Sequence, residues 1–317
     1  MSAKLSTPKT LIEVIRIFAD EQVAFEAMRD RRWPNGKVVC PLCGCEKVKF
    51  MAKVRRWNCN GCRKQFSAKT GTIFEESPIP FSKWIPAMWL IANCKNGISS
   101  YELHRALGVT QKTAWFMLHR IRLAMQDDSV EMLGGHVEAD ETYIGGKARN
   151  MHKADRERRI GDGTGFKGKT AVMGILERGG PVQAFVIQSA TKKTVEPILE
   201  GTVMPKSTVY TDALLSYKDI DTWFKHQVID HGIAYVEGQI HTNGLENFWS
   251  LLKRGIRGTY VSVEPFHLFR YLDEQVYRYN ARKMDDSFRF QEVASQAIGK
   301  RLTYRQLTGK ECPPAVA

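Results

Sequence analysis

The sequence predicts an α+β protein built from several domains. Its 317 residues exceed what one hydrophobic core usually serves. Along the chain, helical periodicity gives way to paired C-x-x-C motifs, then to more helices, and finally to strands interleaved with helices. We therefore expect an N-terminal helix, a metal-binding ribbon, a helical region, an α/β domain with a mixed sheet and a helical tail. The corresponding segments are residues 1–35, 36–72, 80–128, 134–283 and 284–317.

The overall charge indicates a polyanionic partner. The formal net charge is +13, which favours nucleic acid first and an anionic membrane surface a distant second. The sequence has no run of 18 or more apolar residues, so no membrane span is predicted. Residues 1–6 lack the apolar core of a signal peptide. The chain is therefore expected to act in the cytoplasm, without a membrane partner.

Apolar residues recur at helical spacing from about Thr10 to Arg31. This periodicity predicts a single packing helix at the start of the chain. The arginines at its end could touch phosphate, although a solvated charge run explains them equally well.

A cysteine cluster follows this helix. Five of the seven cysteines lie between Cys40 and Cys62, which in a reducing compartment indicates metal binding rather than disulfides. Two C-x-x-C pairs separated by fifteen residues match a four-thiolate zinc site. Cys45 is the surplus cysteine, and Gly44 and Gly61 are expected to permit the tight turns. The predicted zinc ligands are Cys40, Cys43, Cys59 and Cys62.

The ribbon between these pairs has two predicted strands, Val48–Phe50 and Arg56–Asn58. One reading is that zinc only folds this small module, which has too little core to fold alone. The other is contact with nucleic acid, because basic residues crowd the ribbon. These are Lys47, Lys49, Lys53, Arg55, Arg56, Arg63 and Lys64.

The next segment carries signals of a helix-turn-helix. After the apolar run Phe81–Ala92, Ser99 and Glu102 form a capping box that begins one helix, Gly108 ends it, and Thr110 caps the next. Two short helices joined by such a turn fit a helix-turn-helix, although an ordinary helical hairpin has the same pattern. The residues expected to reach DNA bases are Gln111, Lys112 and Thr113.

From Gly134 onward the pattern becomes mixed α/β. A strand carrying Asp140 precedes a basic, glycine-rich segment at 145–170, which we expect to be a mobile loop. The later elements are a hairpin at 171–176 and 182–187, a helix at 193–199, a strand at 207–211 before Asp212, a short helix at 214–217, a strand near 227–229, a helix around Glu246 and a helical stretch at 265–282.

The order of these elements is that of a ribonuclease-H-like domain. In that fold two acids come from adjacent strands and a third from a helix beside them. Three carboxylates that meet in space can bind two Mg²⁺ ions for an in-line phosphoryl displacement. The candidates are Asp140, Asp212 and Glu246. Lys253 lies two helical turns beyond Glu246 on the same face, where it could neutralise phosphate.

Each acid also has a simpler explanation. Asp212 could be a helix N-cap, and Glu246 could be the second half of a cap begun by Asn243. Glu138 or Glu141 could replace Asp140. Strand alternation places Glu138 on the face of Asp140 and Glu141 on the opposite face.

The chain resembles the insertion-sequence DDE transposases that carry an N-terminal zinc ribbon and a helix-turn-helix. The likeness covers nearly the whole chain. It rests on the two cysteine pairs, on Asp140-Glu-Thr-Tyr-Ile-Gly-Gly146, on Tyr210-Thr-Asp212 and on the run His241 to Arg254. It implies that Asp140, Asp212 and Glu246 bind Mg²⁺ or Mn²⁺ and that Lys253 is the associated basic residue. Some related groups carry Asn at the third position; Glu246 is preferred over Asn243 because it shares a helical face with Lys253.

The resemblance implies a DNA transposase of a bacterial-type insertion sequence. Such an enzyme binds terminal inverted repeats, cleaves their ends and joins them to target DNA. Its partners are double-stranded DNA and further copies of itself, so association with the nucleoid is expected. Arg254 and Arg257 are expected to bind DNA beside Lys253.

Two other functions fit part of the pattern. One is a DNA-binding regulator with an inactive catalytic domain. The presence of all three acids argues against this function. The other is a ribonuclease-H-type nuclease that cuts without joining.

Overall fold

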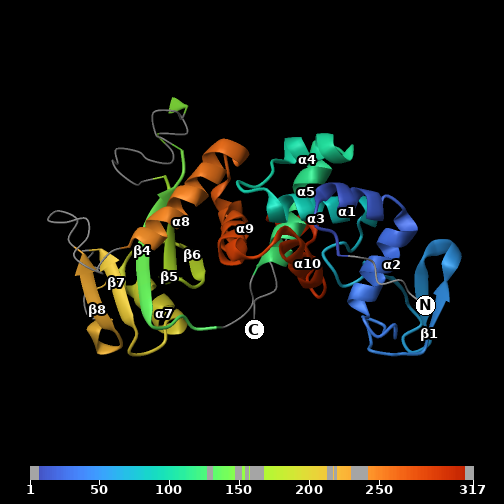
Figure 1. Cartoon of the computed structure of the whole chain (residues 1–317), viewed down its shortest axis with the longest axis horizontal. Coiled ribbons are helices and arrows are strands. Elements are labelled where there is room, and N and C mark those ends of the chain that lie inside the picture. Colours follow the sequence, from blue (N-terminus) through green and yellow to red (C-terminus); the bar gives the residue numbers. More distant parts are fainter. Residues whose placement is uncertain are drawn as a thin grey trace. The chain divides into compact units, whose positions relative to one another are not determined.

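The protein is described by a computed structural model over residues 7–126, 131–146, 152–153, 157, 168–212, 217, 220–229 and 242–310. Contacts divide the chain into two compact units, one of residues 1–126 with 283–317 and one of residues 127–282. The predicted combination of helices, a cysteine ribbon and a mixed sheet is confirmed (Figure 1). Within the described part of the chain, every helix is too short or too polar to span a bilayer.

The first unit begins with two helices where one was predicted. These are α1 (Leu11–Phe18) and α2 (Glu21–Arg32). The prediction was wrong because Asp20 is a strong N-cap: its carboxylate accepts the Gln22 backbone N–H at 2.6 Å and starts a new helix. Helical periodicity alone does not reveal such a break.

A small antiparallel sheet forms the ribbon. It consists of β1 (Val48–Met51), β2 (Arg56–Cys59) and β3 (Gln65–Ser67), with β2 in the centre. The short 3₁₀ turn η1 (Ala52–Val54) joins the two predicted strands. The Trp57 ring stacks between those of Phe25 on α2 and Phe66 on β3, so helix and ribbon share a core.

The predicted caps of the next helices are confirmed. Helix α3 (Phe81–Asn93) is followed by α4 (Ser100–Leu107) and α5 (Gln111–Met125). Ser99 and Glu102 form a reciprocal capping box, and Gly108 ends α4 with a left-handed φ of 59°. The Thr110 side chain accepts the Thr113 backbone N–H at the start of α5.

The C-terminal segment returns to the first unit. Helix α10 (Asp286–Gln296) packs on α3, and α11 (Tyr304–Leu307) follows it. The Arg31 guanidinium donates to the Gln291 carbonyl at 2.9 Å. The tail is thus part of the N-terminal unit's core.

The second unit is built on a five-stranded mixed sheet in the order β6-β5-β4-β7-β8. Strands β4, β5 and β6 are antiparallel neighbours, whereas β7 and β8 run parallel to β4. The bounds are β4 (His136–Ile144), β5 (Thr170–Glu177), β6 (Val182–Ile187), β7 (Thr208–Asp212) and β8 (Lys225–Ile229). The turn η4 (Ile220–Thr222) precedes β8.

Helices cover both faces of this sheet (Figure 1). Helix α7 (Lys192–Thr202) packs on the face that carries Val137 and Ala139. The other face carries Val172 and Leu176 and meets α8 (Asn243–Arg254) and α9 (Leu268–Asn280). Between those helices lie a π-helical stretch, η5 (Gly255–Tyr260), and the 3₁₀ turn η6 (Pro265–His267); η7 (Ala281–Lys283) follows α9.

Strand alternation therefore sorts the acids of β4 between two cores. Glu138 and Asp140 share the face that meets α8, and Glu141 lies on the α7 face, as predicted. Most of the expected short helix at 214–217 and most of the basic 145–170 segment lie outside the described residues.

Candidate active site and zinc centre

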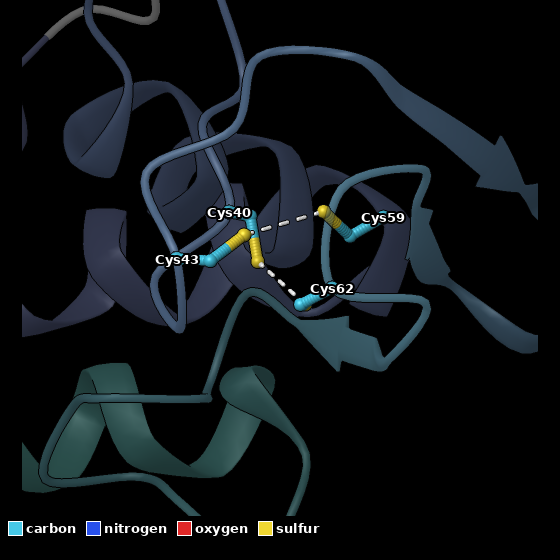
Figure 2. A group of neighbouring side chains, drawn as sticks. All are labelled: Cys40, Cys43, Cys59 and Cys62. Atoms are coloured by element: carbon cyan, nitrogen blue, oxygen red, sulfur yellow. Dashed lines mark hydrogen bonds between the residues drawn. The ribbon is translucent and has the colours of Figure 1, made fainter.

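The four predicted cysteines come together (Figure 2). The sulfur atoms of Cys40 and Cys62 are 3.8 Å apart, and those of Cys43 and Cys59 are 3.6 Å apart. Tetrahedral zinc with Zn–S bonds of ~2.3 Å requires sulfur separations of ~3.8 Å. The geometry therefore fits one structural zinc ion.

The turns around this centre differ in part from expectation. Gly44 has a left-handed φ of 72°, a conformation that glycine permits in a tight turn. Gly61 does not; a Cβ there would lie 2.9 Å from the Cβ of Cys45, so close approach rather than handedness requires glycine. Arg63 takes the left-handed conformation of the second knuckle, with φ 58°. Cys45 stands outside the ligand group, as predicted.

Two of the three candidate acids lie on adjacent parallel strands. Asp140 is in the middle of β4, and Asp212 is the last residue of β7. Glu138 is level with Tyr210 in the pairing of these strands. Extending that register by two residues places Asp212 beside Asp140.

Glu246 lies in the first turn of α8, the helix that packs against β4 and β5. Its side chain is exposed, unlike the partly buried Asp140 and Asp212. The suggestion that Glu246 only completes a cap is not supported. The N-cap position of α8 is Thr242, no side-chain cap forms there, and Asn243 is already helical.

The charges of Asp212 and Glu246 act on Asp140. The pKa of Asp140 is raised to about 6, mainly by burial; the hydrogen bond from Trp249 lowers this pKa, and the negative charges of Asp212 and Glu246 raise it. Among the described residues, only the four cysteines form a group of three or more metal-ligand side chains whose ligand atoms all lie within 4.8 Å of one another. Asp140, Asp212 and Glu246 interact through their charges without forming so compact a group.

The neighbouring glutamates are engaged elsewhere. Glu138 is 1% exposed, accepts Arg178 Nε at 3.0 Å and accepts the Leu245 backbone N–H at 3.0 Å. It thereby anchors the first turn of α8 to the sheet. On the opposite face, burial raises the pKa of Glu141 to about 7, and its carboxylate accepts the Tyr217 hydroxyl at 2.6 Å.

A basic cavity lies at the end of β4. Its volume is about 300 Å³, and both Lys253 and Arg257 line it together with the end of β4 and the residues after η5. Burial lowers the pKa of Lys253, the positive charge of Arg257 lowers it further, and Asp140 opposes both. Arg254 is exposed and does not line the cavity. This concentration of positive charge suits a phosphate group.

The three residues predicted to reach DNA bases lie in the first turn of α5. Each makes a contact within the chain. Gln111 donates to the Ser100 hydroxyl at 2.8 Å, the Lys112 ammonium lies 4.8 Å from the Tyr304 ring, and the Thr113 hydroxyl is 2.8 Å from that of Thr110. All three therefore contribute to local structure, whatever else they bind.

Sequence reasoning missed several side chains around the acids. Trp249 donates its indole N–H to Asp140, Arg178 pairs with Glu138, and Tyr217 holds Glu141. Trp249 reads as one more apolar residue of an amphipathic helix. Its only signal was its position, three residues after Glu246 on the face that also carries Lys253.

Comparison with known proteins covers both units. The ISXO2-like transposase domain matches residues 132–280, and the transposase zinc-ribbon domain matches residues 19–65. A Halobacterium salinarum protein described as an uncharacterized protein in transposable element ISH50 is 31% identical over 252 residues, which cover 76% of this chain and 84% of the relative. An uncharacterized transposase-like protein of Haemophilus influenzae is 33% identical over 100 residues, covering 31% of this chain and 80% of the relative.

Proposed function

This chain belongs to the ISXO2-like transposase family, and we propose that it cuts and joins DNA at Asp140, Asp212 and Glu246 by a DDE mechanism. The observation that supports the proposal is the register of β4 and β7, which brings Asp212 beside Asp140, together with the packing of α8, which carries Glu246 in its first turn, against β4. Repulsion among the three acids leaves negative charge that a divalent cation would relieve. Carboxylate oxygens are the ligands that Mg²⁺ and Mn²⁺ prefer.

The three carboxylates would hold two such cations, which supply activation of the attacking hydroxyl and stabilisation of the leaving oxygen. In the first step water attacks the phosphodiester at an element end and frees a 3′-hydroxyl. In the second step that hydroxyl attacks a target phosphodiester, so one phosphodiester bond forms as another breaks. Lys253 and Arg257 would hold a phosphate in the cavity that they line, and the exposed Arg254 would bind DNA beside it.

Recognition of the element ends is assigned to the first unit. The zinc ribbon and the α4–α5 pair would bind the terminal inverted repeats as a helix-turn-helix, with Gln111, Lys112 and Thr113 nearest the bases. The net charge of +13 supports DNA as the partner. Pairing two ends would require a homo-oligomer on DNA, and the protein would then be associated with the nucleoid. In this proposal the chain works through five segments, residues 1–35, 36–72, 80–128, 134–283 and 284–317.

The test is cleavage of a labelled duplex that carries an element end, in Mg²⁺. Asp140→Ala should abolish cleavage and leave binding to the duplex intact. Glu200→Ala, which removes an exposed acid on α7, is the matched control and should cleave normally. Cleavage by the Asp140 variant at the wild-type rate would refute the assignment.

A second assay separates a transposase from a nuclease that only cuts. A pre-cleaved end with a free 3′-hydroxyl is mixed with supercoiled target DNA and wild-type protein. The proposal requires a joined product that depends on Asp212 and Glu246. A protein that cleaves the intact end and yields no joined product is a nuclease.

A further inference from the structure

We propose that Trp249 is a positioning residue for the catalytic cation: its indole N–H holds one oxygen of Asp140 and leaves the other oxygen for the metal. The inference rests on the proposed function, because it concerns Asp140 as a metal ligand. Trp249 is neither one of the three acids nor the lysine associated with them.

The central contact is short and sheltered. Trp249 Nε1 donates to Asp140 Oδ2 at 2.8 Å, and Trp249 is 4% exposed. An indole N–H is a donor without an acceptor, so it can bind a carboxylate but not a cation. It also carries no formal charge, so it orients Asp140 without repelling a divalent ion. A lysine in its place would neutralise the carboxylate and compete with the metal.

A glycine in the sheet makes room for the indole. Gly174 on β5 lies directly opposite Asp140 in the antiparallel pairing. A Cβ at Gly174 would lie 2.7 Å from both Cη2 and Cζ2 of Trp249, closer than atoms can approach. A glycine inside a strand usually marks such a close approach. The missing side chain therefore lets the ring lie across β5 and reach Asp140.

Helix α8 then links this contact to the other site residues. Trp249 follows Glu246 by three residues and precedes Lys253 by four, so the three share one helical face. The Trp249 ring also packs against that of Phe248, with centroids 5.1 Å apart. Seating the indole against the sheet thus sets the position of the helix that carries Glu246 as well.

The test measures metal binding apart from catalysis. Mn²⁺ is titrated into the zinc-loaded full-length chain, and free Mn²⁺ is followed by electron paramagnetic resonance. Trp249→Phe keeps an aromatic ring and removes the donor. Gly174→Ala keeps the donor and displaces the ring. Partners that orient a ligand usually change metal affinity by ~10–100-fold, so each variant should bind Mn²⁺ at least ~10-fold more weakly.

Leu272→Ala is the packing control, because it removes a buried side chain of the same hydrophobic core from the neighbouring helix α9. It should lower the melting temperature and bind Mn²⁺ like wild type. In a cleavage assay with Trp249→Phe, raising Mn²⁺ should restore much of the lost rate, whereas a merely structural loss would not respond to metal.

The outcomes separate this inference from the proposed function. Wild-type Mn²⁺ affinity in a folded Trp249→Phe protein overturns the inference and leaves the triad in place. Mn²⁺ binding that Asp140→Ala does not alter overturns both. If Trp249→Phe does not fold, Mn²⁺ affinity is measured in Gly174→Ala instead. Wild-type affinity in a folded Gly174→Ala protein overturns the inference that Trp249 positions Asp140.

Discussion

Replacing Arg178 by Met should destabilise the α/β unit by about 3 kcal/mol. Glu138 is 1% exposed, and the Arg178 guanidinium lies 3.0 Å from its carboxylate. Removing one member of a buried pair costs roughly 3–5 kcal/mol, because the other charge is left uncompensated. The lower end of that range applies here, since the Arg178 side chain is 20% exposed and water screens part of the interaction.

The double variant distinguishes a buried charge from simple loss of packing. Glu138→Gln keeps an oxygen that can accept the Leu245 backbone N–H and should cost about 1–2 kcal/mol. Adding Glu138→Gln to Arg178→Met removes the stranded charge. The double variant should therefore be more stable than Arg178→Met alone, by about 1 kcal/mol.

Differential scanning calorimetry on the full chain measures these effects. A change of 1 kcal/mol shifts the melting temperature of a unit of this size by roughly 2–4 °C, so Arg178→Met should lower it by about 6–12 °C. Only the transition of the α/β unit should move. If the losses in the two single variants simply add in the double variant, the pair is not coupled and the reasoning is refuted.

Two further predictions concern zinc and pH. Cys43→Ser should lower the zinc content of the purified chain, measured by atomic absorption, whereas Cys45→Ser should retain one zinc per chain; equal zinc in both variants would contradict the ligand assignment. Burial raises the folded-state pKa of Glu141 to about 7 from an ordinary value of 4.5, so the folded state holds this proton more tightly than the unfolded state does. Without divalent metal, this contribution to stability is present below about pH 4.5 and is lost as pH rises towards 7, by up to about 1.4 kcal/mol for each unit of pKa difference. Calorimetry at pH 5 and pH 8 should show that Glu141→Gln loses less unfolding free energy over this pH range than wild type does. An equal loss in the two proteins would exclude Glu141 as the source of the pH dependence.

Local motifs were the most predictable part of the chain. The cysteine spacing, the capping box of Ser99 and Glu102, and the left-handed Gly108 all depend on residues close in sequence, and all three are confirmed. The break in the first helix at Asp20 was not predicted. Apolar spacing continues across the break, and a single capping side chain decides the outcome.

The mixed sheet was predictable in outline because strand and helix periods alternate along the second half of the chain. Strand alternation also assigned the acids of β4 correctly to opposite faces. Pairing was harder to foresee. Asp212 lies beside Asp140 because β7 runs parallel to β4, and that neighbour relation joins residues far apart in the chain.

The sequence by itself determined a zinc ribbon, a capped helix pair and a strand with an acid at Asp140, because each rests on local spacing. Only the tertiary structure decided what surrounds that acid. Trp249 reaches Asp140 across 109 residues of sequence, and Gly174 makes the space for its ring. Such contacts leave no periodic signal, since a packed interior depends on the shapes of side chains brought together by the whole fold.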